Sequence, residues 1–549
     1  MSWLSDVATF AEHVAHPDVH VVPAPTWVHR TRDVEVPVRD GTLLRLDVYT
    51  DERDSSPRPV IMSAHPYGKD KLPQKKGPVW LISPQFRVFR MTGPISFSEY
   101  TGWEAPDPAF WVEHGYAVVN CDVRGAGTSD GKWNPLSHQE GEDVADVIEW
   151  IAQQPWCDGN VGMMGVSYLA LSQYQSSALN PPHLKATCPW EGFTDVYRDF
   201  ARPGGIQEDG FLSMWSHLTG RITRTDIDLL AEVRSNELDN EFYDSLRAPL
   251  EDIQVPMLVC GSFSDHLLHS RGSLEAFRRV GSSQKWLWTH RGGKWTTFYS
   301  EEAKADQLAF FNHFLKGDDN GWDARPRVRL VTMDGSKEQV EFVKDFPPSD
   351  VTPVRLFIHK DGSLGRHSGD EGELRWSDRS SPLALTWRVD QDVRLTGPME
   401  LNLMISSDDT DADIIVAVGH RRDGKRIEYE GSYGFAHDYI TQGFLRASQR
   451  RVDDAKSVEG APVLSHQVSE PLVIGERARL RIPLHASSTL LRAGDELVVE
   501  LHSSWMWPHN VATGQFPARY VTLPDPAPIT IHVGSASGSA LVAPARAAG

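Results

Sequence analysis

The segment VGMMGVSYLALS, residues Val161–Ser172, is the stretch from which the fold of this chain follows. Its first half is a short apolar run typical of a buried strand, and its second half has helical spacing. Gly165 and Ser167 lie where the predicted strand ends and the predicted helix begins. A serine at the tip of such a turn is pushed out above the sheet, and the next backbone N–H, that of Tyr168, points at the same space. The segment predicts an α/β unit with Ser167 as a candidate nucleophile.

Strands and helices alternate over much of the chain. RPVIMSAH, HGYAVVNCDVRG, VPMLVCGSFSD and QKWLWTH read as buried strands, and HQEGEDVADVIEWIAQQP and SEEAKADQLAFFNHFLKG as helices. Such alternation predicts a parallel sheet covered by helices. Residues 193–250 carry only helical patterns, which indicates an inserted cap. Short alternating runs then predict a C-terminal β-sandwich of the jelly-roll type. The expected domains are an α/β core (1–192 and 251–345), a helical cap (193–250) and the sandwich (346–549).

Composition excludes several classes of partner. The formal net charge of −20 over 549 residues argues against binding to nucleic acid or to an anionic membrane. No run of about 20 apolar residues exists that would span a bilayer. The first residues lack a basic start and a continuous apolar stretch, so no secretory signal is expected. The four cysteines form no C-x-x-C pair, and a reduced, cytoplasmic setting is predicted.

A nucleophilic serine needs a base and a carboxylate that orients the base. On this kind of sheet they follow in the order Ser, Asp or Glu, His, each at the end of a later strand. Asp265 comes just after the strand in VPMLVCGSFSD, and His290 ends QKWLWTH. We therefore predict a triad of Ser167, Asp265 and His290.

Each of these residues also has a structural interpretation. A serine beside a glycine is more often structural than catalytic, and an aspartate at a strand end is usually a turn former. Leu169 stands where the pattern G-x-S-x-G has its second glycine. Other histidines are further candidates for the base: His266, His269 and His313.

Motifs along nearly the whole chain resemble the CocE/NonD family, the cocaine esterase and X-Pro dipeptidyl-peptidase-like hydrolases. They are AHPYGKD, DVRGAGTSDG, QPWCDGNVGMMGVSY, VPMLVCGSFSD, NHFLKG, SSDDTDAD, GFLRAS and LRAGDELVVELHSSWMWPHNVATG. The resemblance implies an α/β-hydrolase core, a helical cap and a C-terminal jelly roll. Ser167 resembles the family nucleophile. Tyr67 of HPYGKD resembles the side chain that completes the oxyanion hole beside the Tyr168 N–H; its alternative role is packing.

Two features depart from the family pattern. The span from Ser167 to Asp265 is short by family standards. Substrate contacts that cap helices make in other family members can therefore not be assigned directly to residues of this chain. The segment after Tyr67 is long and aromatic, and we consider it a candidate to take over part of that role. The motif THRGGKW also replaces the commoner Trp-Ser-His pattern at His290.

The resemblance implies acyl transfer to water through an acyl-enzyme, without a cofactor. Family members act on aryl or alkyl esters, on α-amino acid esters and β-lactam side chains, or on X-Pro peptides. Those that bind a free α-amino group carry an acidic cluster, part of it shortly after the catalytic aspartate. The residues 266–268 that follow Asp265 are not acidic, which argues against that subgroup. Glu191 and Asp195 stay open as substitutes.

Aromatic residues near the acyl side are the candidate substrate contacts, with core packing as the alternative role: Trp190, Phe193, Phe211 and Trp215. They favour a small-molecule carboxylic ester with a bulky apolar or aromatic group. An amidase or acylase, an X-Pro dipeptidyl-peptidase-type enzyme and an α-amino acid ester hydrolase are the alternatives. A carbohydrate-binding protein with an inactive hydrolase scaffold is a further alternative from another class. The natural substrate, the preference between ester and amide, and the oligomeric state, a homo-oligomer included, stay open.

Two motifs invite a ligand-binding interpretation. The glycines of DVRGAGTSDG follow a strand, but no helix opens on them and no lysine is placed as in a P-loop, which favours a structural turn near the active site. DDTDAD has oxygen ligands at calcium-like spacing but lacks the EF-hand glycine, which favours a sheet edge. No metal site is predicted.

Overall fold

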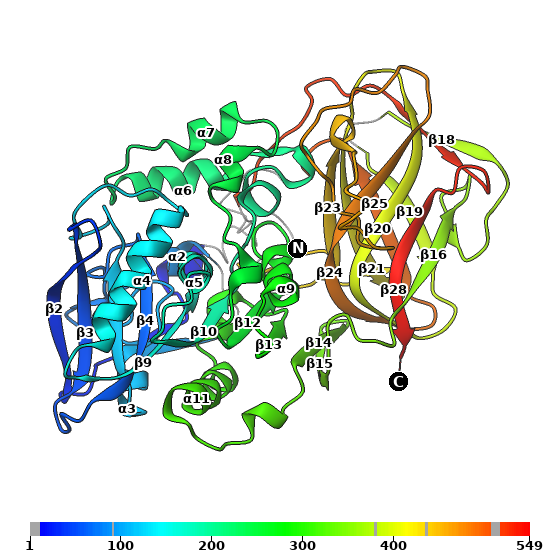
Figure 1. Cartoon of the computed structure of the whole chain (residues 1–549). Helices are drawn as coiled ribbons and strands as arrows, with labels where there is room; N and C mark the ends of the chain where they lie inside the picture. The colour runs from blue at the N-terminus through cyan, green and yellow to red at the C-terminus, as the bar shows by residue number, and fades with distance from the viewer. Residues whose placement is uncertain (1–10, 90–92, 378–380, 434–437, 507–516, 549) are drawn as a thin grey trace.

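The computed structural model describes residues 11–89, 93–377, 381–433, 438–506 and 517–548. The described chain forms an α/β body and an all-β body that lie side by side (Figure 1). The buried apolar side chains form two clusters, one mainly in each body, and the first also takes in Phe444 and Tyr520 of the all-β region. The first body holds the predicted catalytic residues.

A ten-stranded sheet forms the centre of the α/β body. Its strands are hydrogen-bonded in the order β2, β3, β8, β4, β9, β10, β12, β13, β14, β15, and all neighbours from β8 to β14 are parallel. The bounds are β2 (Val28–Pro37), β3 (Leu43–Asp51), β8 (Ala117–Asp122), β4 (Arg58–His65), β9 (Cys157–Val166), β10 (Leu184–Trp190), β12 (Met257–Ser262), β13 (Lys285–His290), β14 (Val328–Asp334) and β15 (Lys337–Val343).

The central strands are continuous apolar runs because helices cover the sheet. β8 and β12 are buried along their whole length. In the helix HQEGEDVADVIEWIAQQP the expected apolar face is buried, and Ser137 caps it by accepting a hydrogen bond from the Glu140 N–H. The helices of this body are α3 (Pro108–Glu113), α4 (His138–Ala152), α5 (Tyr168–Ser177), α9 (Ser270–Arg279), α10 (Lys294–Phe298) and α11 (Glu301–Lys316).

Two insertions lie over the sheet. The first joins β4 to β8 and holds β5 (Gln74–Lys76), β6 (Val79–Leu81), α2 (Gln85–Val88) and β7 (Ile95–Ser98), which pairs with β1 (Val19–Val22). The second is helical, as expected, with α6 (Phe211–Gly220), α7 (Leu229–Ser235) and α8 (Glu241–Asp244) grouped at the top of Figure 1. The limits 193–250 for a cap stay a prediction.

The all-β body consists of two layers of strands. In one layer β20 pairs with β24, β27 and β28; in the other β21 lies between β23 and β25, and β19 pairs with β25. The bounds are β16 (Thr352–Ile358), β17 (Leu364–Gly365), β18 (Gly372–Trp376), β19 (Leu383–Arg388), β20 (Val393–Ser407), β21 (Asp413–Arg422), β22 (Lys425–Arg426), β23 (Thr441–Arg446), β24 (Ala478–Leu491), β25 (Glu496–His502), β26 (Tyr520–Val521), β27 (Ile529–Val533) and β28 (Ala540–Ala547). This is the expected sandwich; its jelly-roll topology stays a prediction.

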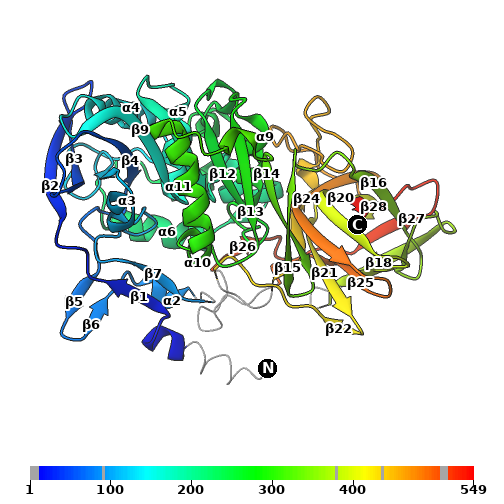
Figure 2. The same cartoon turned by 90° about the horizontal axis from the view of Figure 1, so that it is seen from below.

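Backbone hydrogen bonds join the two bodies. β14 of the α/β sheet pairs in parallel with β24, and β11 (Gln207–Glu208) in the helical insertion pairs with β26. Figure 2 shows β14 and β24 next to each other at this junction. The all-β body is therefore fixed against the side of the sheet that carries β12, β13 and α9.

Candidate active site

Ser167 lies on a strained turn between β9 and α5. Its backbone has φ 58° and ψ −116°, a conformation that residues with a side chain rarely adopt. Gly165 lies two residues before it, and a Cβ there would come within 2.5 Å of the Leu169 Cβ. The turn therefore needs glycine at Gly165, whereas Leu169 occupies the position of the second glycine without conflict. The Ser167 hydroxyl faces a cavity.

His269 is the histidine that contacts Ser167. Its Nε2 lies 3.2 Å from the Ser167 Oγ, and its Nδ1 lies 2.5 Å from the Asp265 Oδ2. The N–H groups of His269 and Ser270 both donate to the Asp265 carbonyl, so one helical turn follows Asp265 and leads into α9. This turn brings side chains four residues apart to the same side. The three side chains form a chain of contacts from carboxylate to imidazole to hydroxyl.

The structure does not bring His290 to Ser167, which corrects our assignment of the base. His290 ends β13, and its Nε2 bonds to the Glu191 Oε1 at 3.0 Å. Glu191 follows β10 with a positive φ of 48° and is fully buried. The rule that the base follows the next strand led to His290, but that position holds a second carboxylate–histidine pair. The sequence feature that could have indicated His269 as the base is its position four residues after Asp265.

A buried lysine completes the charges around Asp265. The Lys294 Nζ lies 2.7 Å from the Asp265 Oδ2 and 3.9 Å from the Glu191 Oε2. Burial alone would raise the pKa of Asp265, but the Lys294 ammonium and then His269 outweigh it and hold that pKa below its usual range. Burial, and next the Lys294 charge, lowers the pKa of His269. Asp265 is thus kept as a carboxylate and His269 as a neutral imidazole.

The cavity above Ser167 has a volume of about 620 Å³ and mostly apolar walls. Three of the four predicted substrate contacts line it, namely Phe193, Phe211 and Trp215. Trp190 does not: it is fully buried, with its ring packed against Trp288, His290 and Phe298. The prediction for Trp190 is therefore corrected to core packing. It failed because Trp190 belongs to a central strand, whose side chains are covered on both faces.

The long aromatic segment after Tyr67 forms another wall of this cavity. Val88, Phe89 and Trp103 line it, together with the stretch 81–85. Phe86 packs behind them against Trp103, with ring centroids 4.8 Å apart. The segment therefore occupies the position that we expected of it. Sequence reasoning missed three further aromatic residues that line the cavity, Phe200, Trp295 and Tyr433.

Tyr67 and Tyr168 line the same cavity as Ser167, with their ring centroids 6.2 Å apart, and their role in an oxyanion hole stays a prediction. The Tyr67 hydroxyl accepts a hydrogen bond from the Trp215 Nε1 at 3.4 Å, which leaves its own proton to point elsewhere. Burial raises the pKa of Tyr67 well above 10, so the phenol stays protonated. Tyr168 is the first residue of α5, where a backbone N–H has no partner within the helix. Its side-chain hydroxyl donates to the Glu140 Oε2 at 2.7 Å and anchors this end of α5.

One carboxyl group lines the cavity, that of Glu104. Its side chain is 3% exposed, and its Oε2 has no hydrogen-bond partner. Burial raises the pKa of Glu104 to about 8, which makes the group neutral at pH 7. The two acidic residues left open from the sequence do not line the cavity: Glu191 is held by His290 and Ser432, and Asp195 is paired with Arg198 and Arg247.

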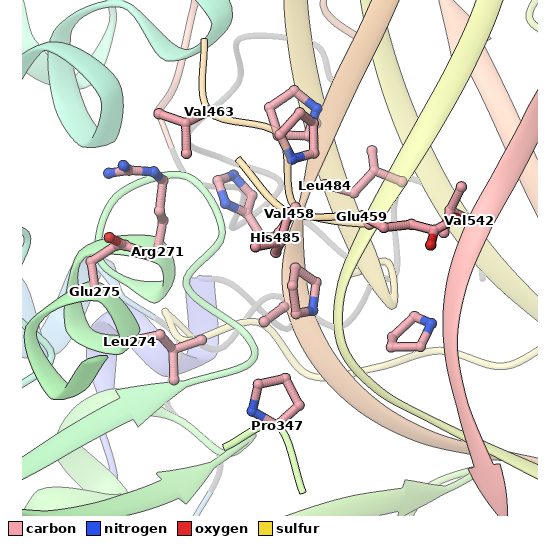
Figure 3. Close-up of a pocket in the computed structure, with 18 of the residues that line it drawn as sticks. Arg271, Leu274, Glu275, Pro347, Val458, Glu459, Val463, Leu484, His485 and Val542 are labelled. Atoms are coloured by element: carbon pink, nitrogen blue, oxygen red, sulfur yellow. The ribbon is translucent and has the colours of Figure 1, made fainter. Parts of the chain in front are cut away.

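A second cavity, of about 510 Å³, lies between α9 and the all-β body (Figure 3). Arg271, Leu274 and Glu275 of α9 face β24 and β28 across it, and Pro347 lies at its lower edge in the view. None of the predicted catalytic residues lines this cavity. Elsewhere on α9, Gly272 packs closely on Phe193 and Thr194, and a Cβ at Gly272 would lie 2.5 Å from the Phe193 Cα.

The two glycine- and aspartate-rich motifs have structural partners. Asp122 accepts hydrogen bonds from the N–H groups of Lys69 and Thr128, and a Cβ at Gly127 would lie 2.0 Å from the Asp122 carboxylate. In DDTDAD, Asp413 is paired with Arg446. The described residues hold no group of three or more metal-binding side chains. The absence of a metal and of a cofactor stays a prediction.

Comparison with known proteins agrees with this architecture. A family described as X-Pro dipeptidyl-peptidase (S15 family) matches residues 40–241, and one described as X-Pro dipeptidyl-peptidase C-terminal non-catalytic domain matches residues 320–542. The chain is 32% identical to a CocE/NonD family hydrolase from Staphylococcus aureus of known structure. The match covers 94% of each chain with a TM-score of 0.88.

The chain belongs to the CocE/NonD family of hydrolases. It is also 28% identical to the cocaine esterase of Rhodococcus sp. (strain MB1 Bresler) over 65% of this chain and 67% of that protein. An α-amino acid ester hydrolase with 15% identity shares the fold, with a TM-score of 0.69 over 96% of this chain and 98% of that chain. The predicted α/β-hydrolase fold with an all-β C-terminal region is thereby confirmed, and so is the membership of a serine hydrolase family.

Among the described residues of this CocE/NonD hydrolase, no helix is both long enough and apolar enough to cross a bilayer. The cytoplasmic location stays a prediction. Part of the family motif LRAGDELVVELHSSWMWPHNVATG, residues 507–514, lies outside the described residues.

The raised pKa of Glu104 predicts a pH-dependent loss of stability. The folded protein retains a proton that the unfolded chain releases above about pH 4.5, so stability falls as the pH rises from 4.5 towards 8. Glu104→Gln removes this titration. We expect its urea midpoint to rise relative to wild type between pH 5 and pH 8. The exposed Glu113→Gln serves as the control and should follow wild type. Parallel curves for Glu104→Gln and wild type would show that the group is ionised throughout.

Proposed function

We propose that this chain is a serine esterase that cleaves a carboxylic ester with a bulky apolar or aromatic group through an acyl-enzyme. The observation that carries the proposal is the contact chain from Asp265 through His269 to Ser167 beneath an aromatic cavity of about 620 Å³. A neutral ester suits such a cavity because the burial of its apolar surface there stabilises the complex by about 25 cal/mol per Å². In its neutral form Glu104 presents no charge that an apolar substrate would have to strip of water.

In the proposed mechanism His269 is the general base. Its Nε2 takes the Ser167 proton as the Oγ attacks the ester carbonyl, and Asp265 holds the ring through Nδ1–H and stabilises the imidazolium. The oxyanion accepts hydrogen bonds from the Tyr67 hydroxyl and the Tyr168 N–H. The imidazolium then protonates the leaving alcohol. A water molecule repeats the sequence on the acyl-enzyme and releases the acid.

A second candidate is an α-amino acid ester hydrolase, which one observation favours. Glu104 offers a carboxyl oxygen without a partner to the cavity, and a substrate ammonium group would pair with it once the carboxyl ionises. The sequence left two further alternatives, an amidase or acylase and an X-Pro dipeptidyl-peptidase-type enzyme. Both must expel an amine, which leaves less readily than an alcohol, and no feature of the cavity favours either of them over an esterase.

A panel of chromogenic substrates tests the proposal. It contains aryl and alkyl esters, free and N-acylated amino acid esters, anilides and an X-Pro anilide, with Ser167→Ala as the inactive control. We expect apolar esters to have the highest kcat/KM, and Ser167→Ala to lower it by about 10³-fold or more. Cleavage of free amino acid esters that Glu104→Gln selectively lowers would favour the second candidate. No cleavage and no labelling of Ser167 by a fluorophosphonate would contradict hydrolase activity altogether.

The identity of the base is tested by a matched pair of histidine variants. His269→Ala removes the group that contacts Ser167, so kcat should fall about as far as in Ser167→Ala, because the residues act as a unit. His290→Ala cuts the pair with Glu191 instead and should lower kcat much less, with its main effect on thermal stability. Steady-state kinetics and melting curves of both variants measure this. An inactive His290→Ala beside an active His269→Ala would return the role to His290.

Tyr67→Phe tests the oxyanion hole. The change keeps the ring and removes the donor, so KM should change little while kcat falls by about 10²–10³-fold, the usual cost of one oxyanion donor. The Trp215 Nε1–H also loses its acceptor, which predicts a small loss of thermal stability. A destabilised Tyr67→Phe with intact kcat would assign Tyr67 to packing alone.

A further inference from the structure

Lys294 is a buried lysine that the proposed mechanism does not use. It is the first residue of α10, and it is 0% exposed. Its Nζ lies 2.7 Å from the Asp265 Oδ2 and 2.9 Å from the His269 Nδ1. A buried ammonium group is costly unless its partners compensate for the lost water. Its place beside the carboxylate and the imidazole, in contact with both, therefore indicates a role in the pair rather than in packing.

The geometry around Asp265 restricts the direction of the hydrogen bonds. The Asp265 Oδ2 lies within reach of both the His269 Nδ1 and the Lys294 Nζ. A carboxylate accepts from both, whereas a protonated Asp265 would be a donor itself. The ammonium keeps Asp265 ionised, and two acceptors 2.5 Å apart would repel each other, so the His269 Nδ1 carries the proton. The Lys294 Nζ, 2.9 Å from this Nδ1, then donates to the Asp265 Oδ2 and not to the ring. The lone pair of Nε2 then faces the Ser167 hydroxyl, as a base requires.

The C-terminal all-β region holds Lys294 in this place. The Tyr433 hydroxyl accepts a hydrogen bond from the Lys294 Nζ at 3.0 Å, and the ammonium lies 4.6 Å from the centre of the Tyr433 ring. The Ser432 carbonyl accepts the Lys294 backbone N–H at 2.8 Å. The Ser432 hydroxyl donates to the Glu191 Oε2, the other carboxylate near the ammonium. Both residues fall within the stretch 320–542 that matches a domain described as non-catalytic.

We propose that Lys294 is a positioning residue for the His269–Asp265 pair, and that Ser432 and Tyr433 of the C-terminal region hold it there. The inference rests on the proposed function of Ser167 and His269. It extends the active centre to the all-β body, which the family description leaves outside catalysis. His269 then carries its proton on Nδ1, as a base for Ser167 requires, only when the α/β body and the all-β body are assembled.

The pH dependence of Ser167 reactivity follows from the groups that face His269. These are Asp265 and Glu191, which favour the imidazolium, and Lys294, which disfavours it; Tyr433 faces the ammonium from the other side. Burial and the Lys294 charge lower the pKa of His269, so the neutral base persists below pH 6.5. Removal of the ammonium makes the imidazolium easier to form. The acid limb of the pH profile should then move to higher pH.

The experiment measures the rate at which a fluorophosphonate labels Ser167 in the full chain between pH 4.5 and pH 9. This readout needs the base but no knowledge of the substrate. In Lys294→Met the acid limb should move up by at least about one pH unit, the size expected for a unit charge removed a few ångströms away. Lys294→Arg keeps the positive charge, so its acid limb should lie close to that of the wild-type protein. Lys316→Met, which removes an exposed lysine at the end of α11, should leave the limb in place.

The contribution of the all-β region is measured with Tyr433→Phe, which keeps the ring and removes the acceptor. Its limb should move in the same direction by a smaller amount. Most of this shift should disappear in the Lys294→Met background, because the Tyr433 hydroxyl contacts Lys294 at 3.0 Å and reaches Asp265 itself only at 3.5 Å. Tyr439→Phe is the matched control, since that hydroxyl donates to Glu500. Circular dichroism monitors folding, and Tyr433→Phe and Lys294→Arg carry the test if Lys294→Met does not fold.

Two results overturn the inference in distinguishable ways. A wild-type chain that is not labelled at any pH removes the proposed function, and this inference with it. Normal labelling with an acid limb that stays in place in Lys294→Met, or in Tyr433→Phe if that variant carries the test, removes only the role of Lys294.

Discussion

The charge of one buried carboxylate, Asp265, is the constraint on which the candidate site depends. An ion taken out of water costs several kcal/mol unless donors surround it, and Asp265 has two close ones, His269 and Lys294. They come from different places in the chain: His269 from the turn before α9, and Lys294 from α10 after β13. The sheet, the two helices and the all-β region are arranged so that both donors reach the same oxygen.

The two bodies of the molecule are less separate than their folds imply. Backbone pairing of β14 with β24 joins them at the edge of the sheet, and β11 with β26 joins them at the helical insertion. Between these junctions Ser432 and Tyr433 reach Glu191 and Lys294. Apolar packing also crosses the junction, because the core of the α/β body takes in Phe444 and Tyr520 of the all-β region. The polar contacts at the candidate site add a second physical reason for a fixed arrangement.

The cavity above Ser167 is assembled from both insertions of the sheet. α6 contributes Phe211 and Trp215, and the segment before β8 contributes Phe89, Trp103 and Glu104. Because loops at the ends of strands vary without disturbing the sheet, substrate preference within such a family is free to change while the residues on the strands stay in place. The single carboxyl among aromatic walls is the feature of this cavity that would discriminate most between neutral and cationic esters.

The sequence by itself determined the elements that follow from local pattern. The apolar run before Gly165 and the helical spacing after Ser167 predict the strained turn, and the buried run before Asp265 places that carboxylate at the end of a strand. The change to short alternating strands predicts the all-β region. These signals are local because strand burial and helix periodicity are both visible within a window of about 11–18 residues.

Only the tertiary structure decided between His269 and His290. Each of them follows or ends a strand whose carboxyl end lies at the site. The order Ser, Asp or Glu, His, each at the end of a later strand, favours His290. The choice depends on Glu191, which bonds to His290 from across the sheet, and on the turn after Asp265, which directs His269 towards Ser167. The same holds for Trp190, Lys294 and Tyr433. Their roles depend on contacts with neighbours 98 to 168 positions away in the chain, and such contacts leave no periodic trace in the sequence.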